Sequence, residues 1–307
     1  MTAAGAVVAI DAGQTGMKVR VVHRDAAPID QIFPGIRTHE PLLPQLAAVA
    51  MAVTREHRVR IDVLAAGVSG LTPAEADAES LRAAVVTGPP DRVLLAHDSV
   101  TSYLGALGDR PGAVVAAGTG VVTLAVGGHR VARVDGWGNI MGDAGSGYWI
   151  GREALDAVMR AHDGRGPRTE LSELAAQYWP DIESAYIELQ GADDRVARIA
   201  ALARGVAALA DHDDVAGAIC RRAASELAHS VATALDRVAD APTDEAHVAA
   251  VGGVFHANAI RAGFARELAL RYPQARLHAA QGAGVDGTAE LARLDPGHPL
   301  LSHVSVA

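Results

Sequence analysis

The sequence is poor in cysteine and lysine, and the scarcity of cysteine limits what the protein can be. Cys220 is the only cysteine among 307 residues. Disulfides within the chain, cysteine-rich zinc sites and an all-protein iron–sulfur cluster are therefore excluded, and a reducing cytoplasm is the natural setting. Lys18 is the sole lysine, which a genomic preference for arginine codons explains.

Long apolar runs and excess positive charge are also missing. The most apolar candidates, such as the segment around 113–117, are broken by glycine well before membrane-spanning length. The chain enters a strand pattern, V-V-A-I-D, with no basic signal-peptide region before it. The formal net charge of −9 argues against nucleic acid as the main partner. We expect a cytoplasmic protein with neither a membrane nor a nucleic-acid partner.

Half of the residues are hydrophobic, and their periodicity predicts an α/β fold. Strands are expected at 7–10, 17–22, 63–69, 93–96, 113–117, 121–126, 131–134, 248–251 and 276–278. Helices are expected at 43–58, 73–85, 98–107, through the alanine-rich stretch from 151 to about 240, at 258–270, and after 288.

A strand–glycine turn–strand unit occurs twice, at 7–22 and 113–126, as a duplicated α/β fold would leave it. The stretch G-D-R-P-G at 108–112 lies between the two copies. We therefore expect an N-terminal lobe of residues 1–108, joined by a C-terminal helix at 288–307, and a second lobe of residues 109–287.

Both glycine turns suit phosphate binding. The first, D-A-G-Q-T-G-M-K, offers backbone N–H groups at Gly13, Gln14 and Thr15 beside the carboxylate of Asp11, a pairing that fits a phosphate chain with its Mg²⁺. Lys18 adds a point charge or decorates an exposed strand face. An ordinary hairpin would explain the same residues.

The second turn is A-A-G-T-G, with Gly118, Thr119 and Gly120 at its centre. It cradles a terminal phosphate or is another hairpin, and its matching place in the second half favours the phosphate. Later, V-G-G-V presents Gly252 and Gly253 after a strand, a candidate for close approach of adenine and ribose.

Asp98 closes the apolar run R-V-L-L-A-H-D just before a helix. It is either the N-cap of that helix or a carboxylate at the carboxyl end of a strand, where ligands bind in open α/β sheets. In the second case it accepts the proton of a substrate hydroxyl during phosphoryl transfer. We expect His97 to be structural, because neighbouring side chains on a strand point to opposite faces.

The stretch from 135 to 152, D-G-W-G-N-I-M-G-D-A-G-S-G-Y-W-I-G-R, combines glycines with polar and aromatic groups. Asp135 and Asp143 supply acceptors for sugar hydroxyls, and Trp137 and Trp149 supply planes for a sugar ring. Alternatively, this is a glycine-rich turn whose tryptophans belong to the core.

Together these motifs resemble the sugar kinase, Hsp70 and actin superfamily, and more closely the N-acetylglucosamine kinase family, which groups with the BadF-type ATPases. The segment G-W-G-x-x-x-G-D-x-G-S-x-Y-W-I-G, from Gly136 to Gly151, is the most specific part. The resemblance implies a two-lobed actin-like (ribonuclease H-like) fold, with an interlobe cleft that closes on the sugar. The resemblance implies these roles: Asp11 near the metal; Gly13 and Thr15 in the first phosphate loop; Gly118, Thr119 and Gly120 in the second, which also borders the sugar; Gly252 and Gly253 at the adenosine; Asp98 as catalytic base; and Ser69, Gly70 and Asp143 at the sugar. The residues themselves add Gln14 and Lys18 as candidates at the phosphates, and Asp98, Asp135 and Gly136 as candidates at the sugar.

The chain departs from the family pattern at two places. Ala144 replaces the glutamate of G-D-E-G-S, and no asparagine occurs at 33–40, where Thr38 and His39 stand instead. Cys220 alone cannot hold the cluster of the dehydratase-activating BadF-type ATPases, nor the zinc of many bacterial glucokinases of the repressor/kinase group.

The expected function is that of an ATP- and Mg²⁺-dependent kinase acting on the 6-hydroxyl of N-acetylglucosamine. A glucosamine, other hexosamine or N-acetylmuramic acid kinase is the alternative within the class. A non-catalytic sugar or nucleotide sensor is the alternative outside it. The resemblance also implies a homodimer; the alanine-rich helices at 195–238 either pack against a partner or form the core of the second lobe.

Overall fold

The structure is a computed structural model that describes residues 5–23, 26–239 and 245–307. The chain divides into two compact units. Unit 1 holds the chain up to Pro111, Gly128–Val131 and Ala279–Ala307, and unit 2 holds Gly112–Gly127 and Ala132–His278. Residues 279–287, assigned from the sequence to the second lobe, therefore belong to unit 1.

Unit 1 is built on a six-stranded mixed sheet with the order β11-β5-β4-β1-β2-β3. Its strands are β1 (Gly5–Ala12), β2 (Met17–His23), β3 (Ile29–Phe33), β4 (Arg60–Val68), β5 (Arg92–His97) and β11 (Val304–Val306). β1, β4 and β5 run parallel, whereas β2, β3 and β11 join antiparallel. The carboxyl ends of the three parallel strands thus share one edge.

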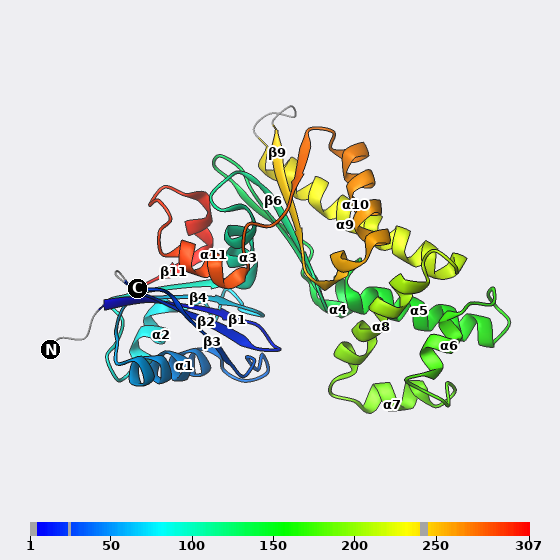
Figure 1. Cartoon of the computed structure of the whole chain (residues 1–307), viewed down its shortest axis with the longest axis horizontal. Coiled ribbons are helices and arrows are strands. Elements are labelled where there is room, and N and C mark those ends of the chain that lie inside the picture. The colour runs from blue at the N-terminus through cyan, green and yellow to red at the C-terminus, as the bar shows by residue number, and fades with distance from the viewer. Residues whose placement is uncertain (1–4, 24–25, 240–244) are drawn as a thin grey trace. The chain divides into compact units, whose positions relative to one another are not determined.

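Helices cover both faces of this sheet (Figure 1). α1 (Leu42–His57) and α2 (Ala78–Ala84) cover one face, and α3 (Asp98–Leu107) and α11 (Gly284–Leu291) pack together on the other. Alternate residues of β1, such as Val8 and Ile10, join the core on the α1 side. Since the side-chain period of a strand is two, Asp11 faces the α3 and α11 side.

Two helices of unit 1 differ from the sequence prediction. The helix expected at 288–307 is wrong: α11 ends at Leu291, and the chain finishes in η2 (Pro299–His303) and β11. α2 begins at Ala78 instead of 73, because the Asp77 side chain caps it by accepting the Ser80 N–H.

Unit 2 is built on a five-stranded sheet with the order β10-β9-β6-β7-β8. Its strands are β6 (Gly112–Ala117), β7 (Val121–Val126), β8 (Val131–Val134), β9 (Ala246–Val251) and β10 (Ala275–His278). α9 (Asp214–Val238) packs on this sheet and against α10 (Asn258–Arg271). The buried alanines of α9 lie in the core of unit 2; the helix end expected at Asp240 lies outside the described residues.

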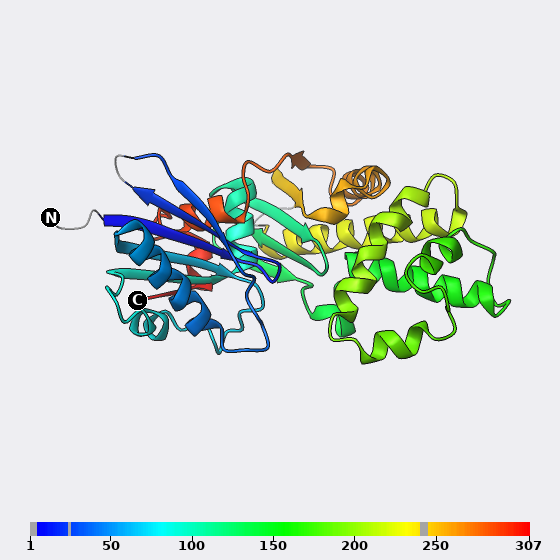
Figure 2. The same cartoon turned by 60° about the horizontal axis from the view of Figure 1, so that its bottom comes forward.

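The remaining helices of unit 2 are α4 (Gly138–Met141), α5 (Gly147–His162), α6 (Leu171–Ala176), α7 (Ala185–Gly191) and α8 (Arg195–Leu209). α5 to α8, green to yellow-green in Figure 2, form a helical group beside the sheet of unit 2. Across the described parts of the chain, no helix is both long and apolar enough to cross a membrane.

Candidate active site

Three predicted site residues of unit 1 come from the carboxyl ends of parallel strands. Asp11 is near the end of β1, Ser69 follows β4, and Asp98 follows β5. The register pairs β1 with β4 and β4 with β5. The structure therefore brings these three residues to one edge of the sheet, the edge at which open α/β sheets bind ligands.

Asp11 lies partly buried against the start of α11. A Cβ atom built on Gly284, the first residue of α11, would lie 2.7 Å from Asp11 Oδ2, so a side chain there would displace the carboxylate. Burial raises the pKa of Asp11 to about 6; the charge of Lys18 lowers it and that of Asp98 raises it. Lys18 is exposed and lies opposite Asp11 in the β1–β2 register.

The side chains around Asp11 fit a cation whose ligands are mainly water and phosphate oxygens, with few from the protein. In the described residues, no group of three or more His, Cys, Asp or Glu side chains could hold a metal ion. Mg²⁺ commonly takes one or two carboxylates, several waters and substrate phosphates. A buried carboxylate with a raised pKa gains from a nearby positive charge, so Asp11 suits the protein's share of such a site.

Asp98 is the first residue of α3, and the N-cap is His97. The His97 imidazole accepts the Ser99 N–H at 3.1 Å, which leaves the Asp98 carboxylate free of the capping role. The simpler interpretation of Asp98 as an N-cap is therefore wrong. His97 caps α3, but its side chain does not point away from Asp98 as expected: Nδ1 lies 2.9 Å from Asp98 Oδ1, because Asp98 belongs to the helix and not to the strand.

The first glycine turn is a short, braced hairpin. The Gly13 N–H donates to the Gly16 carbonyl at 3.2 Å, and the Gly13 carbonyl accepts the Ile36 N–H at 3.0 Å. Gln14 and Thr15 form its exposed tip. The backbone of this turn is fixed from within while its tip stays accessible to a ligand.

Ser69 and Gly70 form the turn after β4. The Ser69 N–H donates to the Ala12 carbonyl at 3.0 Å, which ties this turn to the end of β1. Gly70 has a φ of 76°, and its missing Cβ atom would lie 3.0 Å from Thr38 Cγ2. Thr38, at the position where the family asparagine is missing, is thus a neighbour of the predicted sugar residues; His39 is exposed.

The second glycine turn is fastened to the start of α5. The Gly118 N–H donates to Gly120 O at 2.8 Å, and the carbonyls of Gly118 and Thr119 accept the N–H groups of Gly147 and Tyr148 at 2.8 and 3.1 Å. The Thr119 side chain is exposed. The helix therefore holds the turn in place and leaves Thr119 available.

Asp135 organises the glycine-rich loop. Its carboxylate accepts the backbone N–H groups of Gly136, Asp143 and Ala144 at 2.8, 2.7 and 3.1 Å. Both aspartates have positive φ, 59° for Asp135 and 60° for Asp143, a strained conformation that clusters at functional sites. Asp135 is predicted to bind the sugar, but in this structure both of its carboxylate oxygens accept hydrogen bonds from the loop backbone.

Asp143 joins this loop to the second glycine turn. Its side chain is buried, and Oδ1 accepts the Gly138 N–H at 3.2 Å. A Cβ atom on Gly120 would lie 2.6 Å from Asp143 Oδ2, so the glycine admits the carboxylate. Burial and the charge of Asp135 raise the pKa of Asp143. Gly136, at a φ of 77°, completes the turn that carries it.

The tryptophans divide between the two interpretations. Trp137 is 61% exposed, with the Arg133 guanidinium 4.9 Å from its ring centroid. Trp149 is partly buried and lies beneath Arg222 at 5.0 Å. The fully buried tryptophan is Trp179, outside this loop. Trp137 is thus no core residue and offers an open aromatic face.

The Gly252–Gly253 motif, predicted to contact adenosine, lies directly against the second glycine turn. Gly252 has a φ of 101°, and its missing Cβ atom would lie 2.3 Å from the carbonyl oxygen of Ala117. Gly253 opens η1 (Gly253–His256) with free space at its Cβ position. Ala117 immediately precedes Gly118, so the two motifs, more than 130 residues apart in sequence, meet in unit 2.

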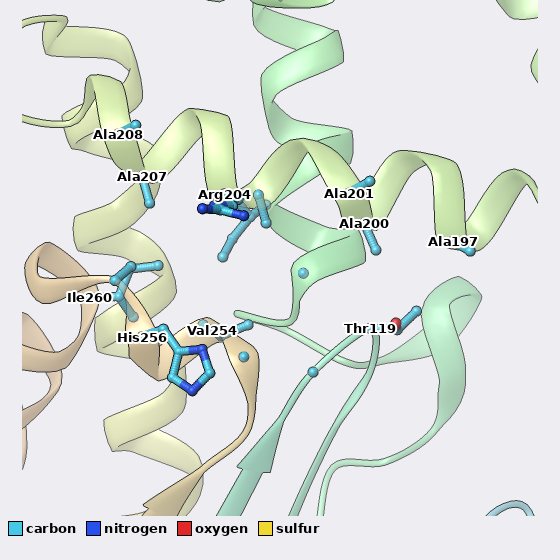
Figure 3. A pocket seen from close by; sticks show the side chains of 16 residues that line it. Thr119, Ala197, Ala200, Ala201, Arg204, Ala207, Ala208, Val254, His256 and Ile260 are labelled. Carbon is cyan, nitrogen blue, oxygen red and sulfur yellow. The ribbon is translucent and has the colours of Figure 1, made fainter. Parts of the chain in front are cut away.

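These motifs border a pocket of about 840 Å³ within unit 2. Figure 3 shows Thr119 on one side of it, with Arg204, His256 and Ile260 toward the other. Its lining comprises Gly118, Thr119, Gly147, Ile150, Ala197, Ala200, Ala201, Ala203, Arg204, Ala207, Ala208, Gly253, Val254, His256, Ala257 and Ile260. A concave, mostly apolar pocket with a few polar groups is typical of a small-molecule site.

Sequence reasoning missed one wall of this pocket entirely. α8 contributes Arg204 and most of the lining alanines. Their spacing at 197, 200, 201, 204, 207 and 208 follows one helical face, a pattern that predicts an apolar face but not what lies against it. Asp98 belongs to unit 1 and Asp143 to unit 2. Each unit thus contains some of the predicted site residues.

Several known proteins similar to this chain are named as sugar kinases. An N-acetylmuramic acid/N-acetylglucosamine kinase of Clostridium acetobutylicum is 30% identical over 210 residues, 66% of this chain and 67% of that protein. A Chromobacterium violaceum structure, described as a candidate N-acetylglucosamine kinase, is similar with a TM-score of 0.71 and 25% identity, covering 93% of this chain and 98% of that one. A glucokinase of Streptomyces griseus, solved with glucose and AMPPNP, has a TM-score of 0.53 at 19% identity, covering 94% and 98%.

The structural likenesses identify the fold as that of the actin-like ATPase sugar kinases, as the sequence predicted. The model of the BadF/BadG/BcrA/BcrD ATPase family matches residues 8–292, nearly the whole chain, and such a family implies the use of ATP. By this match and by its kinase relatives, the chain belongs to the BadF/BadG/BcrA/BcrD ATPase family.

Proposed function

We propose that this protein is an amino-sugar kinase that transfers the γ-phosphate of ATP to the 6-hydroxyl of N-acetylglucosamine. The observation that carries the proposal is the pocket of unit 2, where the second glycine turn and the Gly252–Gly253 motif meet beside a largely apolar space. That arrangement suits a nucleotide, with backbone and hydroxyl groups at the phosphates and alanine methyls at the base. The names of the similar proteins supply the substrate class.

Asp98 is the proposed catalytic base. A sugar hydroxyl is a weak nucleophile and must be aligned with the γ-phosphate. A carboxylate orients the oxygen through a hydrogen bond and takes the proton as the O–P bond forms. Its place beside Asp11 at the strand ends, and its freedom from helix capping, support this role.

The residues that we propose to contact the sugar are grouped here by unit. Ser69 and Gly70 belong to unit 1, and Thr119, Gly120, Asp135, Gly136 and Asp143 belong to unit 2. We propose that Asp143, buried and with a raised pKa, accepts a hydrogen bond from a sugar hydroxyl, and that Asp135 acts by holding the loop in shape. Thr38, beside Gly70, is a further candidate at the missing asparagine.

We propose Mg²⁺ as the metal, near Asp11, with Gly13, Gln14, Thr15 and Lys18 at the nucleotide phosphates. When bound, Mg²⁺ neutralises charge on the phosphates during transfer. Asp11 is the residue of this chain that we expect to hold it, directly or through water, and Lys18 contributes charge beside it.

A homodimer working in the cytoplasm is also part of the proposal. The alanines of α8 and α9 do not argue for it, because they line the pocket or lie in the core of unit 2. The dimer rests on the family resemblance alone, and the mass of the purified protein at micromolar concentration decides it.

The test of function is ADP release by the purified protein with ATP, Mg²⁺ and a panel of sugars. N-acetylglucosamine should give the highest kcat/KM. A higher value with glucosamine or N-acetylmuramic acid would move the assignment within the class. Sugar binding measured by calorimetry, without ADP release from any amino sugar or hexose, would favour a sensor.

A further inference from the structure

The proposed nucleotide pocket carries few polar side chains for recognising a purine base. Among its sixteen lining residues, polar side chains come from Thr119, Arg204 and His256. No carboxylate and no side-chain amide is present in that lining. The inference below rests on the proposed function, since it places the phosphates at Gly118 and Thr119 and the base toward Arg204 and Ile260.

The α8 wall offers methyl groups and a single hydrogen-bonding side chain. Its lining residues, from Ala197 to Ala208, lie inside the helix Arg195–Leu209. Along the middle of this wall, from Ala200 to Arg204, the backbone N–H and C=O groups are engaged in the helix itself. There, Arg204 is the group able to read the edge of a base.

Arg204 is available for that task. Its side chain is exposed and extends from α8 across from His256 (Figure 3). Within the described part of the chain, Arg204 forms no hydrogen bond or ion pair with another residue. Its nearest charged neighbours on the helix differ: Arg198, for example, pairs with Glu188.

The chemistry of a guanidinium favours one kind of purine. Arginine only donates hydrogen bonds, and its fork matches the two acceptors O6 and N7 of guanine. Adenine presents an acceptor at N7 but a donor at its 6-amino group, which a guanidinium cannot accept. His256 does not discriminate, because a neutral imidazole has one donor and one acceptor.

We propose that this pocket takes 6-oxopurine nucleoside triphosphates, GTP and ITP, as phosphoryl donors alongside ATP, with Arg204 recognising O6 and N7. The transfer itself is the same for each donor. The bond between the γ-phosphorus and the bridging oxygen breaks, a bond from the sugar hydroxyl oxygen to that phosphorus forms, and the hydroxyl proton leaves through Asp98. The products are the sugar phosphate and GDP, IDP or ADP.

Direct binding separates this inference from the kinase proposal. Calorimetry without sugar would measure the dissociation constants of ADP, GDP and IDP for the full chain, for Arg204→Met and for the control Arg195→Met, an exposed arginine on α8 that does not line the pocket. Methionine keeps an apolar stem and removes the donors. IDP shares O6 and N7 with GDP but lacks the 2-amino group, so it isolates the proposed contact.

The wild-type protein should bind GDP and IDP within about tenfold of ADP. Arg204→Met should weaken GDP and IDP on the order of tenfold more than ADP, and Arg195→Met should change none of them selectively. A wild-type preference for ADP beyond tenfold, an equal loss for all three in Arg204→Met, or no binding of any diphosphate would overturn the inference. If the diphosphates bind as expected but no sugar is phosphorylated with ATP, GTP or ITP, the proposed function fails and the base preference stands.

Discussion

Replacing Asp11 by asparagine should make the ligand-free protein more stable at neutral pH. Burial, opposed by the charge of Lys18 and helped by that of Asp98, holds the pKa of Asp11 at about 6 against an ordinary 3.8. A difference of this size corresponds to at most ~3 kcal/mol of folding free energy. The folded state keeps this proton more tightly than the unfolded chain. The contribution of this proton to the folding free energy is therefore complete below pH 3.8 and is lost as the pH rises through about 6.

Thermal unfolding between pH 4 and 8 measures this effect. At pH 7.5 the melting temperature of Asp11→Asn should exceed that of the wild type by about 5 °C. This difference in melting temperature should narrow as the pH falls from 6 toward 4. Asp77→Asn is the control, and it should not melt higher than the wild type at pH 7.5. Hydrogen bonds from Ser80 lower the pKa of Asp77, so its charge is favoured in the folded state, and asparagine still caps α2. An Asp11→Asn variant no more stable than wild type at pH 7.5, or a gap independent of pH, would refute the reasoning.

Three further substitutions test the site. Asp98→Asn keeps the shape but accepts no proton, so kcat should fall on the order of 10²–10⁴-fold with ADP affinity unchanged; retention of more than about a tenth of kcat, worth ~1.4 kcal/mol, would remove Asp98 from the base role. Asp143→Asn, which tolerates the positive φ better than alanine would, should raise the sugar KM about tenfold or more; an unchanged KM would contradict the contact. Gly252→Ala should lower the unfolding free energy by ~1–3 kcal/mol or more, because of its φ of 101° and the Ala117 carbonyl; the control Gly253→Ala has open space at Cβ and should fold normally in a denaturant titration.

Local patterns predicted most strands and helices well, because each pattern reflects a single buried face. The failures occurred where longer-range pairing decides. β3 joins the sheet as an edge next to β2, and β11 pairs with β5 from the far end of the chain. The local sequence of Val304–Val306 does not indicate that its partner strand, β5, lies about two hundred residues earlier in the chain. A helix was therefore predicted there.

The residues of the candidate site were easier to predict than their working environment. Gly252 was predicted as a place of close approach, but the group that approaches it, the Ala117 carbonyl, comes from a distant segment. The sequence did not show that Asp143 and Asp11 come as close to Gly120 and Gly284. Likewise, the alanine face of α8 becomes a pocket wall only because η1 and α10 lie opposite. The sequence also could not show that Asp135 uses its carboxylate on loop backbone.

The central claim is the transfer of phosphate to the 6-hydroxyl of N-acetylglucosamine, and the product tests it most directly. The purified protein, ATP, Mg²⁺ and N-acetylglucosamine would be incubated together, and the product examined by two-dimensional ¹H–³¹P correlation spectroscopy. The account predicts a new phosphomonoester whose phosphorus couples to both protons on C6, absent with Asp98→Asn over the same time. Phosphorus coupled to the proton on C1 or C3, or only inorganic phosphate and ADP, would contradict the account.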